Sequence, residues 1–394
     1  MTVDVKNRSP RTVVMFSPTP GGGHALYTAE VMTALCDGEH LDKKYELLTS
    51  CNLDAARRNA AYTIRDILPA LKLRENFGFK IQWMASRILH YFRRDVSTFI
   101  WLLKNPHVCA IHMQEFTTWT AWAFIPMVKK ILRRRVGMTV HNIRPHAYPK
   151  YLPRIFVDKV NKFIFLNCDF LIVHSEKLRG DLIDFVGIYG RARIYIAPHG
   201  VWTLQFDRPA SKNQELFPVI LFFGTIRKNK GLDVLLDAMN YLSGSTRLVI
   251  AGFPDDIGYF NQTIKPKIDA LRSNGRRIEL MASYIDEKDL PDLFLSASLI
   301  ALPYKDFSAQ SGVLFNAIAF GLPIVATSEG ALGETVNRFQ LGVTVKENSP
   351  EEIAAAIQAV LLSNFKERFQ AGFDAAREDL NWRRHAEILS YIYE

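Results

Sequence analysis

Residues 308–334, SAQSGVLFNAIAFGLPIVATSEGALGE, carry the clearest indication of the fold. A short apolar run at 299–303 precedes it and has the composition of a buried strand. Gly312–Phe320 follows with the pattern of an apolar helix, which a glycine and a proline at Gly321–Pro323 bring to an end. A second buried strand is expected at Pro323–Thr327. Two apolar strands joined through a helix predict parallel strands covered by helices on both faces.

The same alternation of strands and helices extends through the rest of the chain. Helical patterns such as His24–Leu35 and Gly231–Leu242 separate the expected strands. These strands are Thr12–Phe16, Val108–His112, Val136–His141, Phe170–His174, Arg193–Ala197, Pro218–Gly224, Arg247–Ala251 and Ile278–Ala282. The sequence therefore predicts an α/β protein with two Rossmann-like, doubly wound parallel sheets, and the linker between them is expected within 198–218.

Composition indicates a globular protein of two domains. The chain has 394 residues, of which 48% are hydrophobic and 23% are charged. It contains no run of the ~20 apolar residues that a membrane helix requires, and its first residues lack the apolar segment of a secretory signal. The four cysteines are widely spaced and are expected to be reduced. We therefore expect a cytoplasmic protein.

Positive charge is concentrated in the first half of the chain. Residues 1–200 carry 29 Lys and Arg against 16 Asp and Glu, a net charge of +13, whereas residues 201–394 have a net charge of −4. The basic residues are densest in 57–94, where large apolar side chains are interleaved with them, and Lys129, Lys130 and Arg133–Arg135 add to this basic surface. This mixture favours an anionic membrane surface. A solvated helix face remains the alternative, and no nucleic-acid-binding motif accompanies the charge.

Ligands of open parallel sheets bind at the carboxyl ends of the strands, so the loops there are candidate sites. Gly21–Gly23 lies between a strand and a helix, where backbone amides can approach phosphate, although a simple tight turn explains it equally well. Arg227 and Lys230 also follow a strand and suit a pyrophosphate leaving group, with an exposed basic turn that binds no ligand as the alternative. Ser311–Val313 begins a helix, whose dipole makes a second place for an anion.

Taken together, these segments resemble the retaining glycosyltransferase family 4, which has the two-domain GT-B fold. The segments that carry the resemblance are PTPGGGHALYTAEVMTAL (18–35), TVHNIRPH (139–146), LIVHSEKLRGDL (171–182), IAPHGV (196–201), GTIRKNKGLDVLLDA (224–238) and GVLFNAIAFGLPIVATSEGALGE (312–334). The resemblance covers residues from about 12 to 390, and the motifs are specific for the fold and the family but not for a substrate.

The resemblance implies a domain plan and a reaction. Residues 1–204 would bind the acceptor, residues 205–375 would bind the nucleotide-sugar across a central cleft, and a helix in 376–394 would cross back to the first domain. The expected reaction is retaining transfer of a sugar from a nucleotide-sugar, with UDP favoured and GDP an alternative. The expected acceptor is a polyprenyl-diphosphate-linked saccharide of surface or exopolysaccharide assembly. The protein would act as a peripheral protein on the inner face of the cell membrane.

The same resemblance implies roles for individual residues. The expected catalytic residues are His112, Glu115, Arg227 and Lys230, although His112 has a packing role as its alternative. The expected donor-binding residues are Gly22, Gly23, Thr225, Tyr284, Ser308, Gln310, Ser311, Gly312, Val313, Leu314 and Asn316. The expected acceptor-side residues are His24, His141, Arg144 and His146. His199, in the linker, is expected to be a hinge residue rather than a ligand.

Two features qualify this assignment. The two glutamates of the family signature are replaced here by Ser308 and Asn316, which bind sugar hydroxyls more weakly than carboxylates do. These replacements leave a degenerate, non-catalytic protein at a membrane as an alternative. A nucleotide-sugar epimerase or hydrolase of the same fold is a further alternative, although it would need acidic residues in the cleft, which Ser308 and Asn316 do not supply. The sequence has no D-x-D motif and no metal-ligand spacing, so a metal-independent reaction without a cofactor is expected, with Arg227 and Lys230 neutralising the leaving group.

Overall fold

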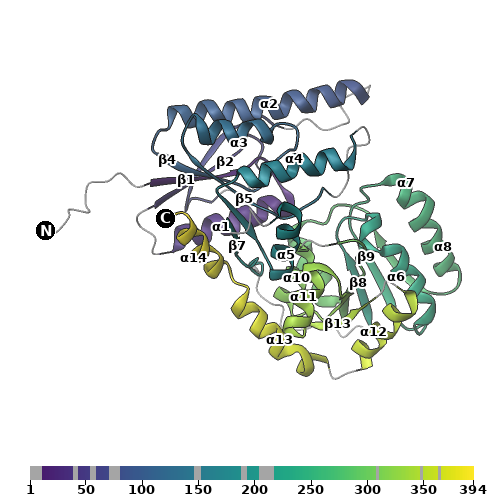
Figure 1. The fold of residues 1–394 in the computed structure, drawn as a ribbon. Coiled ribbons are helices and arrows are strands. Elements are labelled where there is room, and N and C mark those ends of the chain that lie inside the picture. The colour runs from purple at the N-terminus through teal and green to yellow at the C-terminus, as the bar shows by residue number, and fades with distance from the viewer. Residues whose placement is uncertain are drawn as a thin grey trace. The chain divides into compact units, whose positions relative to one another are not determined.

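The computed structural model describes residues 11–38, 43–53, 59–70, 80–145, 152–187, 193–203, 217–307, 310–346, 349–362 and 365–394. The chain forms two compact units (Figure 1). The first unit contains Met1–His199 together with Trp382–Glu394, and the second contains Gly200–Asn381. The sequence analysis put the corresponding boundaries at 204 and 375, and most of the expected linker lies outside the described residues.

The first unit is built on a parallel sheet that has seven strands within the described residues, in the order β3-β2-β1-β4-β5-β6-β7. Its central strands are buried on both faces: in β1 (Arg11–Ser17) every residue after Arg11 is buried. The other strands are β2 (Lys43–Ser50), β3 (Thr63–Leu68), β4 (Val108–Met113), β5 (Arg135–Thr139), β6 (Phe170–Val173) and β7 (Ile194–Ile196).

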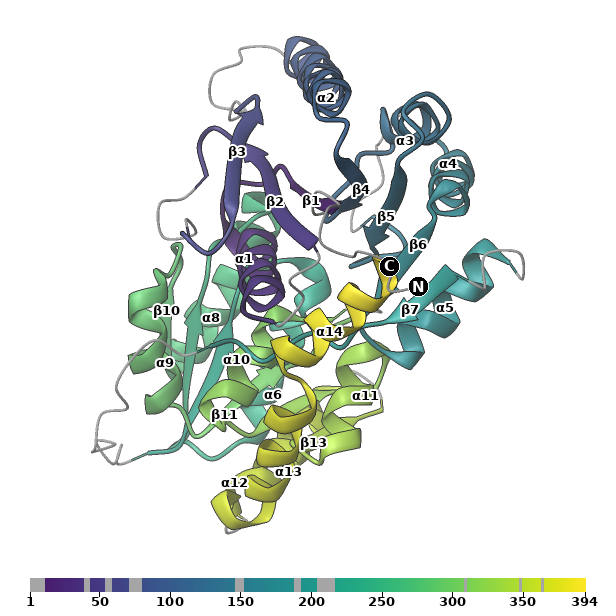
Figure 2. The same ribbon diagram turned by 90° about the vertical axis from the view of Figure 1, so that its left-hand side faces the viewer.

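Helices cover both faces of this first sheet. Figure 2 shows α1 (Gly22–Asp37) and α14 (Trp382–Ile392) on one face, and α2 (Lys80–Lys104), α3 (Ala121–Lys130) and α4 (Arg154–Asn167) on the other. The helix α5 (Glu176–Val186) leads into β7. Helix α14 comes from the far end of the chain and packs against α1, so the first unit is discontinuous in sequence.

The second unit has a parallel sheet of six described strands in the order β10-β9-β8-β11-β12-β13. The strands are β8 (Val219–Phe223), β9 (Arg247–Ala251), β10 (Arg277–Met281), β11 (Leu299–Leu302), β12 (Ile324–Thr327) and β13 (Gly342–Val345). Its helices are α6 (Leu232–Ala238), α7 (Ile257–Tyr259), α8 (Lys265–Ser273), α9 (Leu290–Ser296), α10 (Gly312–Phe320), α11 (Gly330–Phe339), α12 (Pro350–Leu362) and α13 (Phe365–Asp379). The apolar residues of strands and helices form one continuous core, which fixes the ends of β8 and β11 beside each other.

The predicted α/β architecture of two Rossmann-like parallel sheets is confirmed. The helix expected at Gly312–Phe320 has those bounds in the structure. Among the described helices, none is both long and apolar enough to cross a bilayer.

Candidate active site

In the second unit, two loops meet at the carboxyl edge of the sheet. Strands β8 and β11 are neighbours, so the loop after β8 lies beside the loop after β11. Lys305 N–H donates to the Asn229 carbonyl over 2.9 Å and ties the two loops together. Gly231 turns the first loop into α6 with φ 67°, and a Cβ there would lie 1.8 Å from the Pro303 carbonyl oxygen. Only glycine satisfies both the positive φ and this close approach.

Lys230 projects from the first loop onto the second. Its Nζ lies 3.6 Å from the centroid of the Tyr304 ring and 4.5 Å from that of Phe307. Burial, reinforced by the charge of Arg227, lowers the pKa of Lys230 to about 7. The two ring faces compensate part of the lost hydration of the ammonium. The ammonium of Lys230 has therefore lost part of its hydration. An anionic ligand bound beside it would stabilise its charged form.

Arg227 lies three residues before Lys230, just before the short 3-10 turn Lys228–Lys230. Its Nε lies 2.9 Å from Asp255 Oδ2, and both side chains are partly exposed. This pair is solvated and is worth little to stability, so the guanidinium can exchange Asp255 for a phosphate at small cost.

The N-terminus of α10 adjoins the ring that Lys230 covers. Ser311 is the N-cap residue, but its hydroxyl does not cap its own helix and instead lies 3.2 Å from the Tyr304 hydroxyl. The first amides of α10 therefore have no side-chain cap. Gln310 Oε1 is buried and has no hydrogen-bond partner among the described residues. A polar ligand placed here would supply the missing partners.

The remaining expected donor residues differ in how they could contribute. Leu314 is fully buried, so its side chain belongs to the core. Val313 packs over Gly224, and Thr225 and Asn316 are half-buried. Tyr284 follows the edge strand β10 and is 66% exposed, two strands away from β8 in the sheet. Ser308 lies outside the described residues.

One contact in this region had no sequence signal. Trp202 Nε1–H donates to the Gly312 carbonyl over 2.9 Å and fixes the start of the second unit against the first turn of α10. The sequence analysis treated this tryptophan only as part of a linker.

In the first unit, the glycine loop leads into α1. A Cβ on Gly21, Gly22 or Gly23 would meet nothing within 4 Å, so the space over the loop is open. Thr19 Oγ1–H donates to Glu115 Oε2 over 2.6 Å, while Glu115 Oε1 is buried and unpartnered within the described structure. Its neighbour Gln114 likewise has a buried Oε1 without a described partner. The sequence analysis missed Gln114, although it directly precedes Glu115.

His112 is a core residue of the first unit. It is 0% exposed, Nδ1 lies 2.5 Å from the Tyr393 hydroxyl, and Nε2 lies 2.9 Å from Thr139 Oγ1. Both ring nitrogens therefore have partners inside the protein. A sugar hydroxyl would have to displace one of them to reach the ring. The expected contact with the donor, through the ring or the backbone carbonyl of His112, stays a prediction beside the packing alternative.

The expected acceptor-side residues are brought together only in part. The rings of His24 and His141 are 4.8 Å apart. Arg144 is instead directed at Asp158, with its Nε 3.4 Å from Oδ2, and its side chain is largely exposed. His146 lies outside the described residues.

His24 and His141 belong to a larger histidine cluster that the sequence did not predict. Tyr27 is at its centre, in ring contact with four histidines, and His24 joins the cluster through His141. The four are His141, His174, His199 and His385. The Tyr27 hydroxyl lies 3.0 Å from His385 Nε2, and His385 Nδ1 lies 2.8 Å from the Pro198 carbonyl oxygen. His199 packs against Trp382, so it is held within the first unit.

Burial makes the histidines of this unit hard to protonate. It lowers the pKa of His174 to about 4, and those of His112 and His385 to about 3, with the neighbouring histidines adding to the effect. The pKa of His141 is lowered as well, by burial first and by the other histidines second. His112, His141, His174 and His385 are therefore neutral at physiological pH. Across the described residues, no group of three or more His, Cys, Asp or Glu side chains is placed to hold a metal ion.

Comparison with known proteins agrees with this arrangement. The family model described as glycosyl transferases group 1 matches residues 205–376. A D-inositol 3-phosphate glycosyltransferase of Xylanimonas cellulosilytica is 28% identical over 233 residues, which are 55% of this chain and 55% of that protein. The chain thus spans about half the length of this curated relative.

Two solved structures show the same fold over nearly the whole chain. The sucrose-phosphate synthase from Thermosynechococcus elongatus superposes with a TM-score of 0.74 at 18% identity, covering 97% of this chain and 98% of that one. The Anabaena protein HepE in complex with UDP and glucose superposes with a TM-score of 0.69 at 14% identity, covering 96% and 98%. The fold is therefore GT-B, and residues 205–376 match the family model of the group 1 glycosyltransferases.

Proposed function

We propose that the chain is a glycosyltransferase that takes a sugar from a nucleotide-sugar, and that its second unit binds the donor. The observation that carries this proposal is the position of Lys230. Its poorly hydrated ammonium, the uncapped N-terminus of α10 and the unpartnered Gln310 Oε1 lie around the same loop after β11. A diphosphate bound there would supply the hydrogen-bond partners and the negative charge that these protein groups lack.

The leaving group explains why cations are needed. As the bond between the sugar and the diphosphate breaks, negative charge grows on the phosphate oxygen. Lys230, with Arg227 once it leaves Asp255, stabilises this charge in the transition state. Transfer with retention places the acceptor hydroxyl on the face that the diphosphate leaves, and the departing phosphate oxygen accepts its proton.

UDP is the favoured nucleotide. The complex of HepE with UDP and glucose, a protein of the same fold, supports this choice. GDP remains the second candidate, because Ser308 and Asn316 stand where the family signature has glutamates and the sequence does not specify the sugar.

For the acceptor, we propose a polyprenyl-diphosphate-linked saccharide that the first unit binds at an anionic membrane, in surface or exopolysaccharide assembly. The net charge of +13 over residues 1–200 supports this choice, because both the lipid diphosphate and the leaflet are anionic. Within the first unit, the unpartnered Glu115 Oε1 and the open glycine loop provide polar groups for the saccharide.

The experiment is a panel of UDP- and GDP-sugars, with calorimetry for binding and slow release of free nucleotide as the readout of chemistry. We expect one nucleotide class to bind at micromolar concentrations and to be hydrolysed slowly without acceptor. Turnover should persist in excess EDTA, because Arg227 and Lys230 supply the positive charge. Binding without any turnover, with or without a lipid-linked acceptor, would favour the degenerate alternative. A loss in EDTA that Mg²⁺ restores would contradict the metal-independent reaction.

A further inference from the structure

The helix α2 exposes a continuous apolar stripe in addition to its buried side. Leu89, Phe92, Val96, Ile100 and Leu103 are spaced three or four residues apart and therefore lie along one line of the helix. Between 38% and 59% of each side chain is exposed. A helix at a protein surface normally carries polar residues along such a line.

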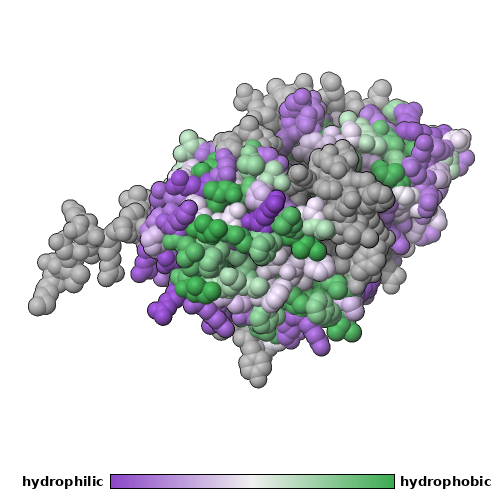
Figure 3. Space-filling view, turned by 90° about the horizontal axis from the view of Figure 1, so that it is seen from above, coloured by the Kyte–Doolittle hydropathy of each residue, from purple (hydrophilic) through white to green (hydrophobic). Residues whose placement is uncertain are grey.

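Helices α3 and α4 continue this apolar surface. Eight further large side chains on these helices and at their ends are 40% to 71% exposed: Trp119, Trp122, Met127, Ile131, Ile155, Phe156, Phe163 and Leu166. Figure 3, which views the molecule from the side of α2, shows apolar side chains gathered there with hydrophilic ones around them. Single exposed apolar residues are common, but a group of this extent marks an interaction surface. We call the three helices and these side chains the helical face.

The charge of the helical face is almost wholly positive. Helices α2, α3 and α4 contain five, two and three Lys and Arg, but only two acidic residues, Asp95 and Asp158. Asp95 is paired with Arg94 and Asp158 with Arg144. Exposed cations remain on these helices and just after α3, at Arg93, Lys104, Lys130, Arg133 and Lys159.

This arrangement corrects the basic surface expected from the sequence. Arg94 is 2% exposed and its Nη2 lies 2.7 Å from Asp95 Oδ1, so it is part of the interior. Lys129 is held by Asp169 and the Asn167 carbonyl, and Arg135 by the Ile392 carbonyl. Much of the segment before α2 lies outside the described residues. The available cations instead lie among the exposed apolar side chains of the helical face.

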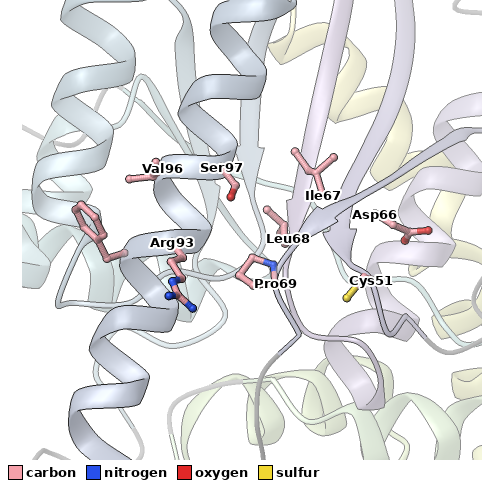
Figure 4. Close-up of a pocket in the computed structure, with 9 residues that line it drawn as sticks. Cys51, Asp66, Ile67, Leu68, Pro69, Arg93, Val96 and Ser97 are labelled. Carbon is pink, nitrogen blue, oxygen red and sulfur yellow. The ribbon is translucent and has the colours of Figure 1, made fainter.

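A cavity opens beside the stripe, between α2 and the end of β3. It has a volume of about 430 Å³, and Figure 4 shows Arg93, Val96 and Ser97 on one side and Ile67, Leu68 and Pro69 on the other. Phe92 also lines it. Cys51 and Asp66 complete the lining, so the cavity combines an apolar wall with one guanidinium and one carboxylate, and the apolar wall suits a segment of hydrocarbon chain.

We infer that the helical face docks on the surface of an anionic bilayer, with the apolar stripe of α2 and the side chains of α3 and α4 inserted at the interface. The inference rests on the proposed function in one respect, the lipid-linked acceptor, which brings the chain to a membrane. Aliphatic side chains among cations match the acyl boundary and the anionic headgroups. Nucleic acid would match the charge but not the exposed Ile and Leu residues.

The first experiment measures insertion through tryptophan fluorescence. Trp119 and Trp122 lie on the helical face and are 41% and 51% exposed. Vesicles that contain anionic lipid with bromine on the acyl chains should quench the fluorescence, and a Trp119→Phe/Trp122→Phe variant should lose most of the quenching. Neutral vesicles should quench it little, because the cations then have no partner.

The second experiment uses a matched pair of leucines in vesicle sedimentation. Leu103→Ser removes an inserted side chain and should lower partitioning onto anionic vesicles about tenfold. Leu362 lies on α12 of the second unit and is 87% exposed, so Leu362→Ser should leave partitioning unchanged. High salt should weaken binding of the wild type without abolishing it, since only part of the attraction is electrostatic.

Three outcomes would overturn the inference. They are equal recovery with neutral and anionic vesicles at low salt, equal partitioning of the two leucine variants, and a wild type that forms a dimer dissociated by Leu103→Ser. Calorimetry with UDP and GDP separates this result from the proposed function. If the protein binds the nucleotide but not the vesicles, only the inference about the helical face is contradicted. If it binds the vesicles but not the nucleotide, the inference about the helical face holds and the proposed transferase function is contradicted.

Discussion

The ammonium of Lys230 lies against two aromatic rings, and partial burial of the residue lowers its pKa to about 7. A diphosphate beside it would raise that pKa, so binding above pH 7 should take up a proton. Affinity should therefore fall as the pH rises from 7 toward 9. Calorimetry in two buffers of different ionisation enthalpy measures the number of protons taken up on binding. The Lys230→Arg variant is charged throughout and should take up none. Heats for the wild type that do not depend on the buffer would contradict this prediction.

Arg227 is expected to act on the same ligand after leaving Asp255. Lys230→Ala and Arg227→Ala should each weaken nucleotide binding by about 1.5–3 kcal/mol, the range of a charge-assisted hydrogen bond. Asp255→Asn is the matched control, because it removes the competing carboxylate 2.9 Å from Arg227 Nε. Its affinity should equal or exceed that of the wild type. If both alanine variants bind as tightly as the wild type, the diphosphate site lies elsewhere.

At the scale of elements, Gly231 sets how the loop after β8 meets the loop after β11. Gly231→Ala should destabilise the second unit by about 1–3 kcal/mol, since a Cβ would clash with the Pro303 carbonyl at a positive φ. It should also weaken nucleotide binding, because Lys230 precedes it. Gly244→Ala in the same unit is the control, as a Cβ there meets nothing within 4 Å. Urea denaturation and calorimetry measure the two effects, and equal behaviour of the two variants would show that this turn does not position Lys230.

Most strands were predictable because a parallel strand buried on both faces is a short apolar run, as in β8 and β11. The exceptions have physical reasons. The edge strand β3 is mostly half-buried and contains Arg65 and Asp66, so it lacks an apolar run. The strand β2 begins with two lysines. The four residues of β13 are mostly half-buried and give only a weak pattern.

At the scale of the whole molecule, the neutral histidines of the first unit predict sensitivity to acid. The unfolded chain protonates its histidines near pH 6.5, whereas His112, His174 and His385 resist protonation in the folded state down to pH 3–4. The unfolded state therefore binds more protons between these limits, and stability should fall as the pH drops below about 6.5. Each such histidine contributes up to about 1.4 kcal/mol per pH unit.

Denaturation by urea at pH 7.5, 6 and 5 tests this dependence. His385→Gln should be less stable at neutral pH but should lose less stability on acidification than the wild type. His107 is exposed, so His107→Gln should follow the wild type at every pH. A stability that does not change between pH 7.5 and 5 would show that the buried histidines are not the groups that titrate.

In the candidate site, features that depend on residues close in the sequence were predictable, and contacts between distant residues were not. Arg227, Lys230 and Ser311 were predictable because strand ends are local features of the sequence, and neighbouring strands bring their loops together. The histidine cluster was not, because Tyr27 and His385 are 358 positions apart and meet only through α14. The burial of His112 depends on the same part of the chain, because Tyr393 directly follows α14.

The position of helix α14 also affects the order in which the two units can complete their folding during translation. Residues 200–381 form the second unit without interruption, so that unit has all its parts as soon as they have emerged. The first unit is synthesised earlier but waits for Trp382–Glu394 to provide the partners of Tyr27 and His112. During this interval one face of its sheet is incomplete, with apolar surface open to chaperones or to aggregation. The first unit to be translated is thus the last to be finished.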